Sequence, residues 1–324
     1  MPIVLKDIPA LSPNLQALPY VHQLIEHQEQ LRVASSKVQG VTVIDCGVNV
    51  LGGWEAGLIF ARICLGGLAQ VKMQWHDFGD LRWPAIEVIT DHPVRACMAS
   101  QYAGWSVKKE KFSAMGSGPA RAAVHAEELF DRLGYQDSAS SAILCLESRK
   151  LPPEDTVKWI MGKCGLKAEN VYILVAPTAS LAGSVQIAAR SVETGLHKLM
   201  ELGYNLGLIE SGWGISPLPP VAADDLTALG RTNDAVLYGA TVQYNLRDED
   251  DRLKLLVEKI PSSSSRDYGL PFRELFERYG NFYDIDPLLF SPAEIWLSNM
   301  KSGGSFHAGG IRPDLLKKSF NLEP

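Results

Sequence analysis

Short runs of hydrophobic residues alternate along the chain with stretches in which hydrophobic residues recur every three or four positions. The short runs are rich in aliphatic residues and bounded by Gly, Pro or Asp, which predicts buried strands, whereas the periodic stretches predict helices. The predicted strands are residues 41–45, 85–90, 142–147, 171–175, 206–210, 235–246 and 290–298. The predicted helices are residues 20–37, 54–65, 119–133, 153–164, 185–202 and 248–260, with a short helix or turn at 222–230. This alternation predicts a mixed α/β protein.

One predicted helix, residues 185–202, carries a column of polar side chains along the edge of its hydrophobic stripe. Gln186, Arg190, Glu193 and His197 are spaced four, three and four apart, which makes them neighbours on a helix surface. Arg190 and Glu193 fit either an ordinary surface ion pair or a carboxylate that a guanidinium orients at the wall of a cleft. His197 is more typical of a partly buried helix residue than of a catalyst. We expect Gly203 to end this helix.

Turns rich in small residues follow or precede several predicted elements. Residues 46–53 (CGVNVLGG) follow the strand that ends at Asp45, and Gly116, Ser117 and Gly118 precede Pro119, a favoured first residue of a helix. Backbone N–H groups of such a turn would suit an anion, and Arg121 could reach the same place. A tight turn that needs positive φ explains the glycines equally well. Neither turn is a Walker A or G-x-G-x-x-G motif, which disfavours nucleotide binding by those routes.

Three further stretches are predicted to be irregular. Residues 1–19 are punctuated by proline and should run extended over the surface, and residues 211–221 (SGWGISPLPPV) form a Gly/Pro-rich loop. Residues 262–272 (SSSSRDYGLPF) are either a flexible serine linker or a fixed turn. A fixed turn would present the hydrogen-bonding side chains of Arg266, Asp267 and Tyr268.

Composition narrows the classes of protein that fit. With 324 residues the chain has ample core for one large domain or two smaller ones, and a net charge of −6 gives no support for nucleic-acid binding. The five cysteines are widely spread without a C-x-x-C pair, which indicates free thiols in a reducing compartment. No stretch has the ligand spacing of a zinc or calcium site, so we expect no metal. No hydrophobic run has the length of a membrane span or signal segment, so we expect a soluble, cytoplasmic protein.

Six strings occur in order along the chain: DCGVNV, GGLA, AMGSGPARA, VAPTAS, GSVQIAARSVET and SRDYG-x-PF. Together they resemble the methenyltetrahydromethanopterin cyclohydrolases over roughly residues 33–307. The resemblance implies reversible hydration of methenyltetrahydromethanopterin to its N5-formyl derivative, a step of one-carbon metabolism in methanogenesis or formaldehyde oxidation, without metal or redox cofactor. It also implies a homotrimer of two-part α/β subunits with a pocket between the parts. We expect an N-terminal arm over residues 1–30 and α/β subdomains over 31–165 and 166–324.

The resemblance favours the functional interpretation of the Arg190–Glu193 pair. Glu193 would stabilise the cationic methenyl carbon and take a proton from the attacking water, and Arg190 would orient it. The carrier's anionic tail would bind the Gly-Ser-Gly turn and Arg121, and the pterin ring would bind the turn of Thr178 and Ser180. The expected substrate-binding residues are Asn49, Gly116, Ser117, Gly118, Arg121, Thr178, Ser180, Gln186, Arg266, Asp267 and Tyr268. Two alternatives are a non-catalytic reduced-pterin-binding protein and an enzyme that acts on a phosphorylated metabolite.

Overall fold

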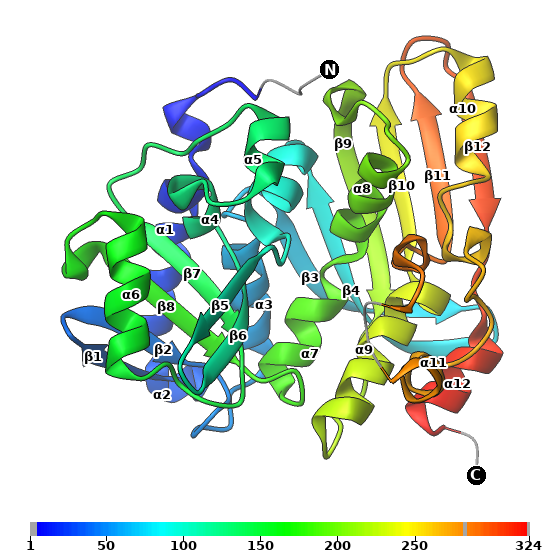
Figure 1. The fold of residues 1–324 in the computed structure, drawn as a ribbon. Coiled ribbons are helices and arrows are strands. Elements are labelled where there is room, and N and C mark those ends of the chain that lie inside the picture. The colour runs from blue at the N-terminus through cyan, green and yellow to red at the C-terminus, as the bar shows by residue number, and fades with distance from the viewer. Residues whose placement is uncertain (1–4, 281–283, 323–324) are drawn as a thin grey trace. The chain divides into compact units, whose positions relative to one another are not determined.

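The computed structural model describes residues 5–280 and 284–322 and divides into two compact units, each assembled from two segments of the chain. The first unit comprises residues 1–70 and 95–186, and the second comprises residues 71–94 and 187–324. Each unit contains a six-stranded sheet (Figure 1). The expected subdomains were each continuous in sequence, so their limits at residues 30 and 165 do not coincide with these units.

The sheet of the first unit has the order β1-β2-β8-β7-β6-β5. Its strands are β1 (Ala34–Val38), β2 (Val41–Asp45), β8 (Val171–Ala176), β7 (Ala142–Glu147), β6 (Phe112–Ser117) and β5 (Trp105–Lys109). The three central strands β2, β8 and β7 are parallel, whereas β1, β6 and β5 each run antiparallel to their neighbours. The carboxyl ends of the parallel strands therefore meet at one edge of this sheet, where α/β proteins commonly bind ligands.

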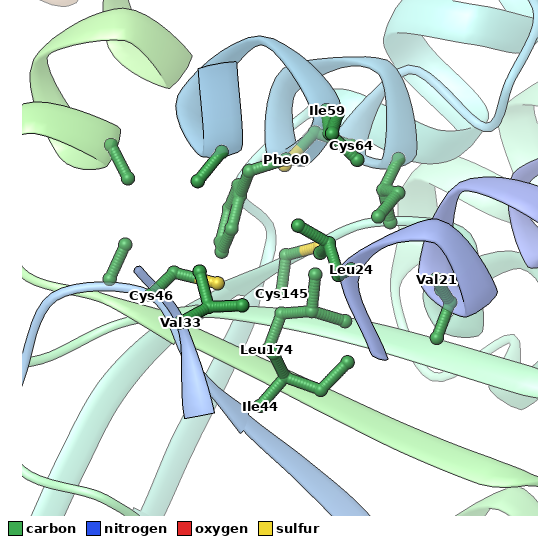
Figure 2. Packing of buried hydrophobic residues seen from close by; sticks show 14 of the residues in the cluster. Val21, Leu24, Val33, Ile44, Cys46, Ile59, Phe60, Cys64, Cys145 and Leu174 are labelled. Carbon is green, nitrogen blue, oxygen red and sulfur yellow. The ribbon is translucent and has the colours of Figure 1, made fainter. Parts of the chain in front are cut away.

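Helices cover both faces of this sheet. Alternate strand residues such as Ile44, Cys145 and Leu174 form one hydrophobic cluster with α1 (Pro13–Glu26) and α3 (Trp54–Cys64), as Figure 2 shows. Their neighbours in sequence form a second cluster with α4 (Ala120–Val124) and α6 (Glu154–Cys164). Burial on both faces explains why these strands read as continuous hydrophobic runs. Two further helices of this unit are α2 (Gln28–Leu31) and α5 (Glu128–Leu133).

The sheet of the second unit has the order β12-β11-β10-β9-β4-β3. Its strands are β12 (Ser305–Gly309), β11 (Glu294–Asn299), β10 (Thr241–Leu246), β9 (Ile209–Pro217), β4 (Leu81–Thr90) and β3 (Gln70–Phe78). Residues of α9 (Asp225–Gly239), α11 (Phe272–Tyr279) and α12 (Pro313–Phe320) form its hydrophobic core with residues of β3, β4 and β9. Helix α8 (Ser191–Glu201) lies along β9 and β10, and α10 (Asp250–Val257) lies along β11 and β12 (Figure 1).

The structure confirms the predicted mixed α/β class, the three central strands of the first unit and the helices α3 and α6. The helix predicted over residues 20–37 was wrong at its end, where residues 34–37 belong to β1. The prediction that residues 1–19 run extended was wrong from Pro13 onward, where α1 begins, and its first four residues lie outside the described part of the chain. Ser12 caps this helix by accepting a hydrogen bond from the Leu15 N–H at 3.2 Å. Proline is tolerated in a first turn, where its missing N–H would have no partner within the helix. Residues 119–133 form α4 and α5 rather than one helix, and His125 between them has a φ of 51°.

Residues 211–221 were wrongly predicted to be a loop, since most of them belong to strand β9. A Cβ atom built at Gly214 would lie 2.6 Å from the Ser191 Oγ, and one at Gly212 would lie 2.8 Å from the Val192 Cγ1. The glycines therefore let α8 approach the strand closely rather than interrupting it. The strand predicted at 235–246 was also wrong in its first half, which belongs to α9.

Candidate active site

A well-ordered loop follows β2 in the first unit. The Asp45 carboxylate is buried and accepts hydrogen bonds from the N–H groups of Gly47, Val48 and Asn49 at 2.9, 2.6 and 2.8 Å. These three bonds occupy both carboxylate oxygens and fix the loop at the carboxyl edge of the sheet. Asn49 is exposed on this loop, so its side chain is placed at the surface as a binding residue requires.

The turn of residues 177–180 lies beside this loop. The Ser180 Oγ donates to the Pro177 carbonyl at 2.7 Å and accepts from the Gly183 N–H at 3.0 Å, which starts helix α7 (Leu181–Ala188). A Cβ at Gly47 would lie 3.1 Å from the Ser180 Cβ, and one at Gly183 would lie 1.9 Å from the Pro177 carbonyl oxygen. Glycine at both positions thus permits close packing of the loop, the turn and α7. Thr178 and Ser180 share this edge with Asn49, but Ser180 is buried and its hydroxyl stabilises the turn.

Sequence reasoning missed one ionisable side chain at this edge. Glu147 is the last residue of β7 and accepts a hydrogen bond from the Thr178 hydroxyl. It is half-buried and pairs with Ala176 in β8 and with Met115 in β6. Its place at the end of a predicted buried strand was the only signal in the sequence that could have identified it.

The predicted helix 185–202 consists of two helices in the structure. Helix α7 ends at Ala188 and α8 begins at Ser191, with Arg190 at its N-cap position in a non-helical conformation (φ −90°, ψ 5°). The polar column is therefore broken, since buried Gln186 lies on α7 whereas Glu193 and half-buried His197 lie on α8. The break places Glu193 in the first turn of α8, where the unpaired N–H groups of a helix favour a negative charge.

Arg190 and Glu193 form an ion pair in the second unit. The Arg190 Nη1 lies 3.5 Å from the Glu193 Oε2, and the two side chains are only 12% and 6% exposed. An ordinary surface ion pair would be solvated, so this burial excludes that interpretation of the spacing. A buried carboxylate beside a guanidinium is a typical arrangement for a group that handles protons.

Contacts along α8 hold its first turn in place. The Tyr244 hydroxyl on β10 donates to the Val192 carbonyl at 2.5 Å. Val192 lies between Arg190 and Glu193 in the sequence, so this bond restrains the backbone of the pair. Further along the helix, the buried Lys198 Nζ donates to the Ser264 Oγ at 3.1 Å and to the Leu288 carbonyl. Burial lowers the pKa of Lys198 to about 8, which the charge of Asp286 partly opposes. The carboxylate of Glu193 therefore stands on a firmly anchored helix.

The Gly-Ser-Gly stretch does not form the expected anion-binding turn. Gly116 and Ser117 belong to β6 and pair with Leu146 and Cys145 of β7. The Gly118 N–H donates to the Ser100 carbonyl at 2.8 Å. The Gly118 N–H is thus occupied, and the other two residues lie within the sheet rather than at a helix N-terminus.

Arg121 does not face an open surface, contrary to the prediction of a tail contact. Its side chain is 0% exposed and forms a bidentate salt bridge with the Glu127 carboxylate, with N–O distances of 2.8 and 2.6 Å. It also donates to the carbonyls of Met98 and Ser100 at 3.3 and 3.1 Å. A Cβ at Gly104 would lie 1.8 Å from the Glu127 Oε2, so the pair is packed tightly against that backbone. With these donors already used, Arg121 stabilises the interior of the first unit.

The turn of Arg266, Asp267 and Tyr268 is fixed rather than a flexible linker. The two oxygens of buried Asp267 accept from the Tyr279 hydroxyl at 2.7 Å and from the Asp286 N–H at 2.8 Å. Tyr268 packs against the core of the second unit, with its ring centroid 5.3 Å from that of Tyr238. Only Arg266 extends into solvent, with a side chain that is 70% exposed. Asp267 and Tyr268 therefore act in holding the turn together.

Within residues 5–280 and 284–322, no three His, Cys, Asp or Glu side chains are grouped so that they could hold a metal ion. Across the same part of the chain, every helix is too short or too polar to cross a membrane.

The sequence of the chain is similar to those of known proteins. The sequence profile described as Cyclohydrolase (MCH) matches residues 12–320. Methenyltetrahydromethanopterin cyclohydrolase of Methanococcoides burtonii is 43% identical over 317 residues, which cover 97% of this chain and 99% of that protein. The enzymes of the same name from Methanocaldococcus jannaschii and Methylobacillus flagellatus are each 43% identical, over 95% of this chain and 98% and 95% of their own lengths. The chain therefore belongs to the MCH cyclohydrolase family.

Proposed function

We propose that this chain is a methenyltetrahydromethanopterin cyclohydrolase, which interconverts the methenyl compound and water with the N5-formyl compound. The observation that supports this proposal most directly is the buried Arg190–Glu193 pair on the first turn of α8. The relatives of this chain from Methanococcoides burtonii and Methanocaldococcus jannaschii are named for this activity.

Glu193 acts on the reacting carbon in two ways. The methenyl carbon belongs to an amidinium cation, which a nearby carboxylate stabilises. A water oxygen attacks this carbon, and Glu193 accepts one of its protons as general base. The bond from the carbon to the second nitrogen then breaks, and that nitrogen takes up a proton. The hydroxyl loses its remaining proton as the formyl C=O forms, so one proton is released as the cationic substrate becomes neutral.

Arg190 acts through Glu193 as a positioning residue. Its guanidinium lies against one carboxylate oxygen of Glu193 and orients the carboxylate. The second oxygen remains the better proton acceptor. Arg190 occupies the N-cap of α8, three residues before Glu193.

Two residues at the carboxyl edge of the sheet in the first unit are placed to bind the substrate. Asn49 and Thr178 would contact the pterin ring, because both are accessible at the carboxyl ends of β2 and β8. The enzyme is proposed to act without a metal or redox cofactor, in the cytoplasm and as a homotrimer. Tetrahydromethanopterin is then the carrier substrate.

A spectroscopic assay of the purified protein tests the proposed activity. The methenyl chromophore should disappear on addition of catalytic amounts of enzyme, with formation of the formyl product. Binding of the methenyl compound with an unchanged chromophore over hours would instead favour a non-catalytic pterin-binding protein. Tight sugar-phosphate binding with no response to the pterin would favour the phosphorylated-metabolite alternative.

A further inference from the structure

Three side chains from adjacent segments gather at the carboxyl edge of the sheet in the first unit. Met115 of β6 lies directly opposite Glu147 of β7, and residues opposite each other in an antiparallel pair project from the same face. Thr178 follows β8 and donates its hydroxyl hydrogen bond to the Glu147 Oε1. An apolar side chain, a carboxylate and a hydroxyl thus lie next to one another.

Glu147 has acceptor capacity that the protein does not use. An ionised carboxylate offers about four lone-pair sites. Only the Thr178 hydroxyl occupies one of them, and the described part of the chain supplies no donor to the Oε2. Asp45 at the same edge differs, since three backbone N–H groups occupy its oxygens. Glu147 is therefore the carboxylate of this edge that can accept bonds from a ligand.

Met115 supplies an exposed apolar side chain next to the Glu147 carboxylate. It is 44% exposed, although the residues on either side of it in β6, Ala114 and Gly116, are buried. A thioether side chain is polarizable and packs well against the faces and edges of flat rings. An exposed methionine beside an incompletely paired carboxylate is suited to a planar ring that carries N–H donors along one edge.

We propose that Glu147, Met115 and Thr178 form the subsite that binds the aminopyrimidinone edge of the reduced pterin. The exocyclic amino group and the adjacent ring N–H are parallel donors, which a carboxylate accepts with charge assistance. Met115 packs against the ring plane, and Thr178 fixes the carboxylate orientation. This subsite rests on the proposed function and gives it a residue for head-group recognition that the sequence did not identify.

Dissociation constants measured without turnover test this subsite independently of the catalytic steps. The probe is a tetrahydropterin with a methyl group in place of the tail, compared with its analogue in which the exocyclic amino group is dimethylated. We expect the unmodified protein to prefer the first compound. Glu147→Gln keeps the shape of the side chain and should weaken binding of that compound by about 10- to 100-fold, the range for a lost charge-assisted hydrogen bond. The dimethylated compound keeps only the ring N–H donor, so its binding should weaken less and the preference for the first compound should fall.

A matched control and a second variant complete the test. Glu154→Gln alters an exposed carboxylate of the same unit that accepts a hydrogen bond from Gln39, and it should leave both dissociation constants unchanged. Met115→Ala should weaken both compounds equally, because it removes packing rather than a hydrogen bond. If Glu147→Gln weakens both compounds equally, or neither, while melting at the parent temperature, the subsite is overturned. Absence of methenyl turnover in the unmodified protein would overturn the cyclohydrolase proposal, whereas the ratio of dissociation constants would still decide the subsite.

Discussion

The Arg190 guanidinium and the Glu193 carboxylate face each other at 3.5 Å across the first turn of α8, and both side chains are nearly buried. The guanidinium and the N-terminal end of the helix both interact favourably with a negative charge at this position. An ionised carboxylate sheltered from solvent interacts more strongly with a cationic substrate than an exposed one does. This relationship leads to the first two predictions.

Glu193→Gln should lower kcat by roughly 10²–10⁴, the usual contribution of a general base. The amide keeps the shape of the side chain but loses the negative charge and the capacity to accept a proton. This loss corresponds to about 3–5 kcal/mol of activation free energy. Steady-state kinetics on the methenyl compound measure it, with Glu201→Gln at the exposed end of α8 as the control. A variant that folds as the parent does and keeps more than about a tenth of its kcat would exclude Glu193 as the base.

Arg190→Ala should also reduce kcat strongly, because an unpaired Glu193 would lose its orientation. If the arginine acts through the glutamate, the double variant should lose much less than the product of the two single losses. The four proteins are compared in one double-mutant cycle of kcat values. Fully multiplicative losses would show that Arg190 contacts the substrate independently of Glu193.

Arg121→Ala should destabilise the first unit rather than raise KM. The substitution leaves the Glu127 carboxylate, whose side chain is only 15% exposed, without its cation. Breaking a buried pair in this way costs about 3–5 kcal/mol, and we expect the lower part of this range because of the remaining exposure. Chemical denaturation measures the free energy of unfolding. Arg82→Ala, which removes an exposed ion pair with Asp77, should cost no more than about 1 kcal/mol.

Asp234 should make stability fall as the pH rises from about 4 to about 7. Burial raises the pKa of this carboxyl to about 7 in the folded state, against 3.8 in the unfolded chain, and nearby Glu274 raises it whereas Lys318 lowers it. Arg231 and Arg273 line the same cavity. Between these two pKa values the folded state keeps a proton that the unfolded chain has released, so the contribution to stability is present below pH 4 and lost above pH 7.

Asp234→Asn tests this dependence, because the amide can still accept from the Phe272 N–H and donate to the Ser319 hydroxyl. Relative to the parent, the variant should gain stability as the pH rises through this window, by roughly 4 kcal/mol at most. Unfolding free energies at several pH values measure the difference. Parallel pH profiles for the two proteins would contradict the proposed titration, and Asp77→Asn provides an exposed control.

Incubation with EDTA followed by gel filtration should leave kcat unchanged, because the proposed chemistry uses a carboxylate and a guanidinium. The assay is the same loss of methenyl absorbance. Activity that disappears and returns on addition of a divalent ion would overturn the metal-free proposal.

The sequence predicted the buried strands of the first unit because both of their faces are covered, which leaves an uninterrupted apolar run. It failed where tertiary packing decides the structure. Gly212 and Gly214 look like loop residues, yet they lie in a strand because α8 packs against them. The break before Ser191 was invisible because the buried residues Ala188, Ala189 and Val192 continue the helical period across it.

Site residues were predictable to the extent that their partners are close in sequence. Arg190 and Glu193 are three residues apart on one helix turn, so spacing alone suggested the pair. The partner of Glu147 is Thr178, in the turn that follows β8, and the parallel register of β7 and β8 brings the two residues together. Arg121 appeared available because the turn at His125, which brings Glu127 back onto it, leaves no mark in the helical pattern.

Because each unit is assembled from two separate segments of the chain, the order of synthesis determines when each sheet can be completed. Strand β4 ends at Thr90 but pairs with β9, whose first residue is Ile209. At typical translation rates of 5–20 residues per second, the interval between these strands takes on the order of 6–24 s. The first unit, in contrast, contains every strand of its sheet once residue 176 has been synthesised. During translation, all strands of the first unit are therefore available for pairing before β9 has been made. Until then, the edge of β4 that will pair with β9 stays exposed in the nascent chain.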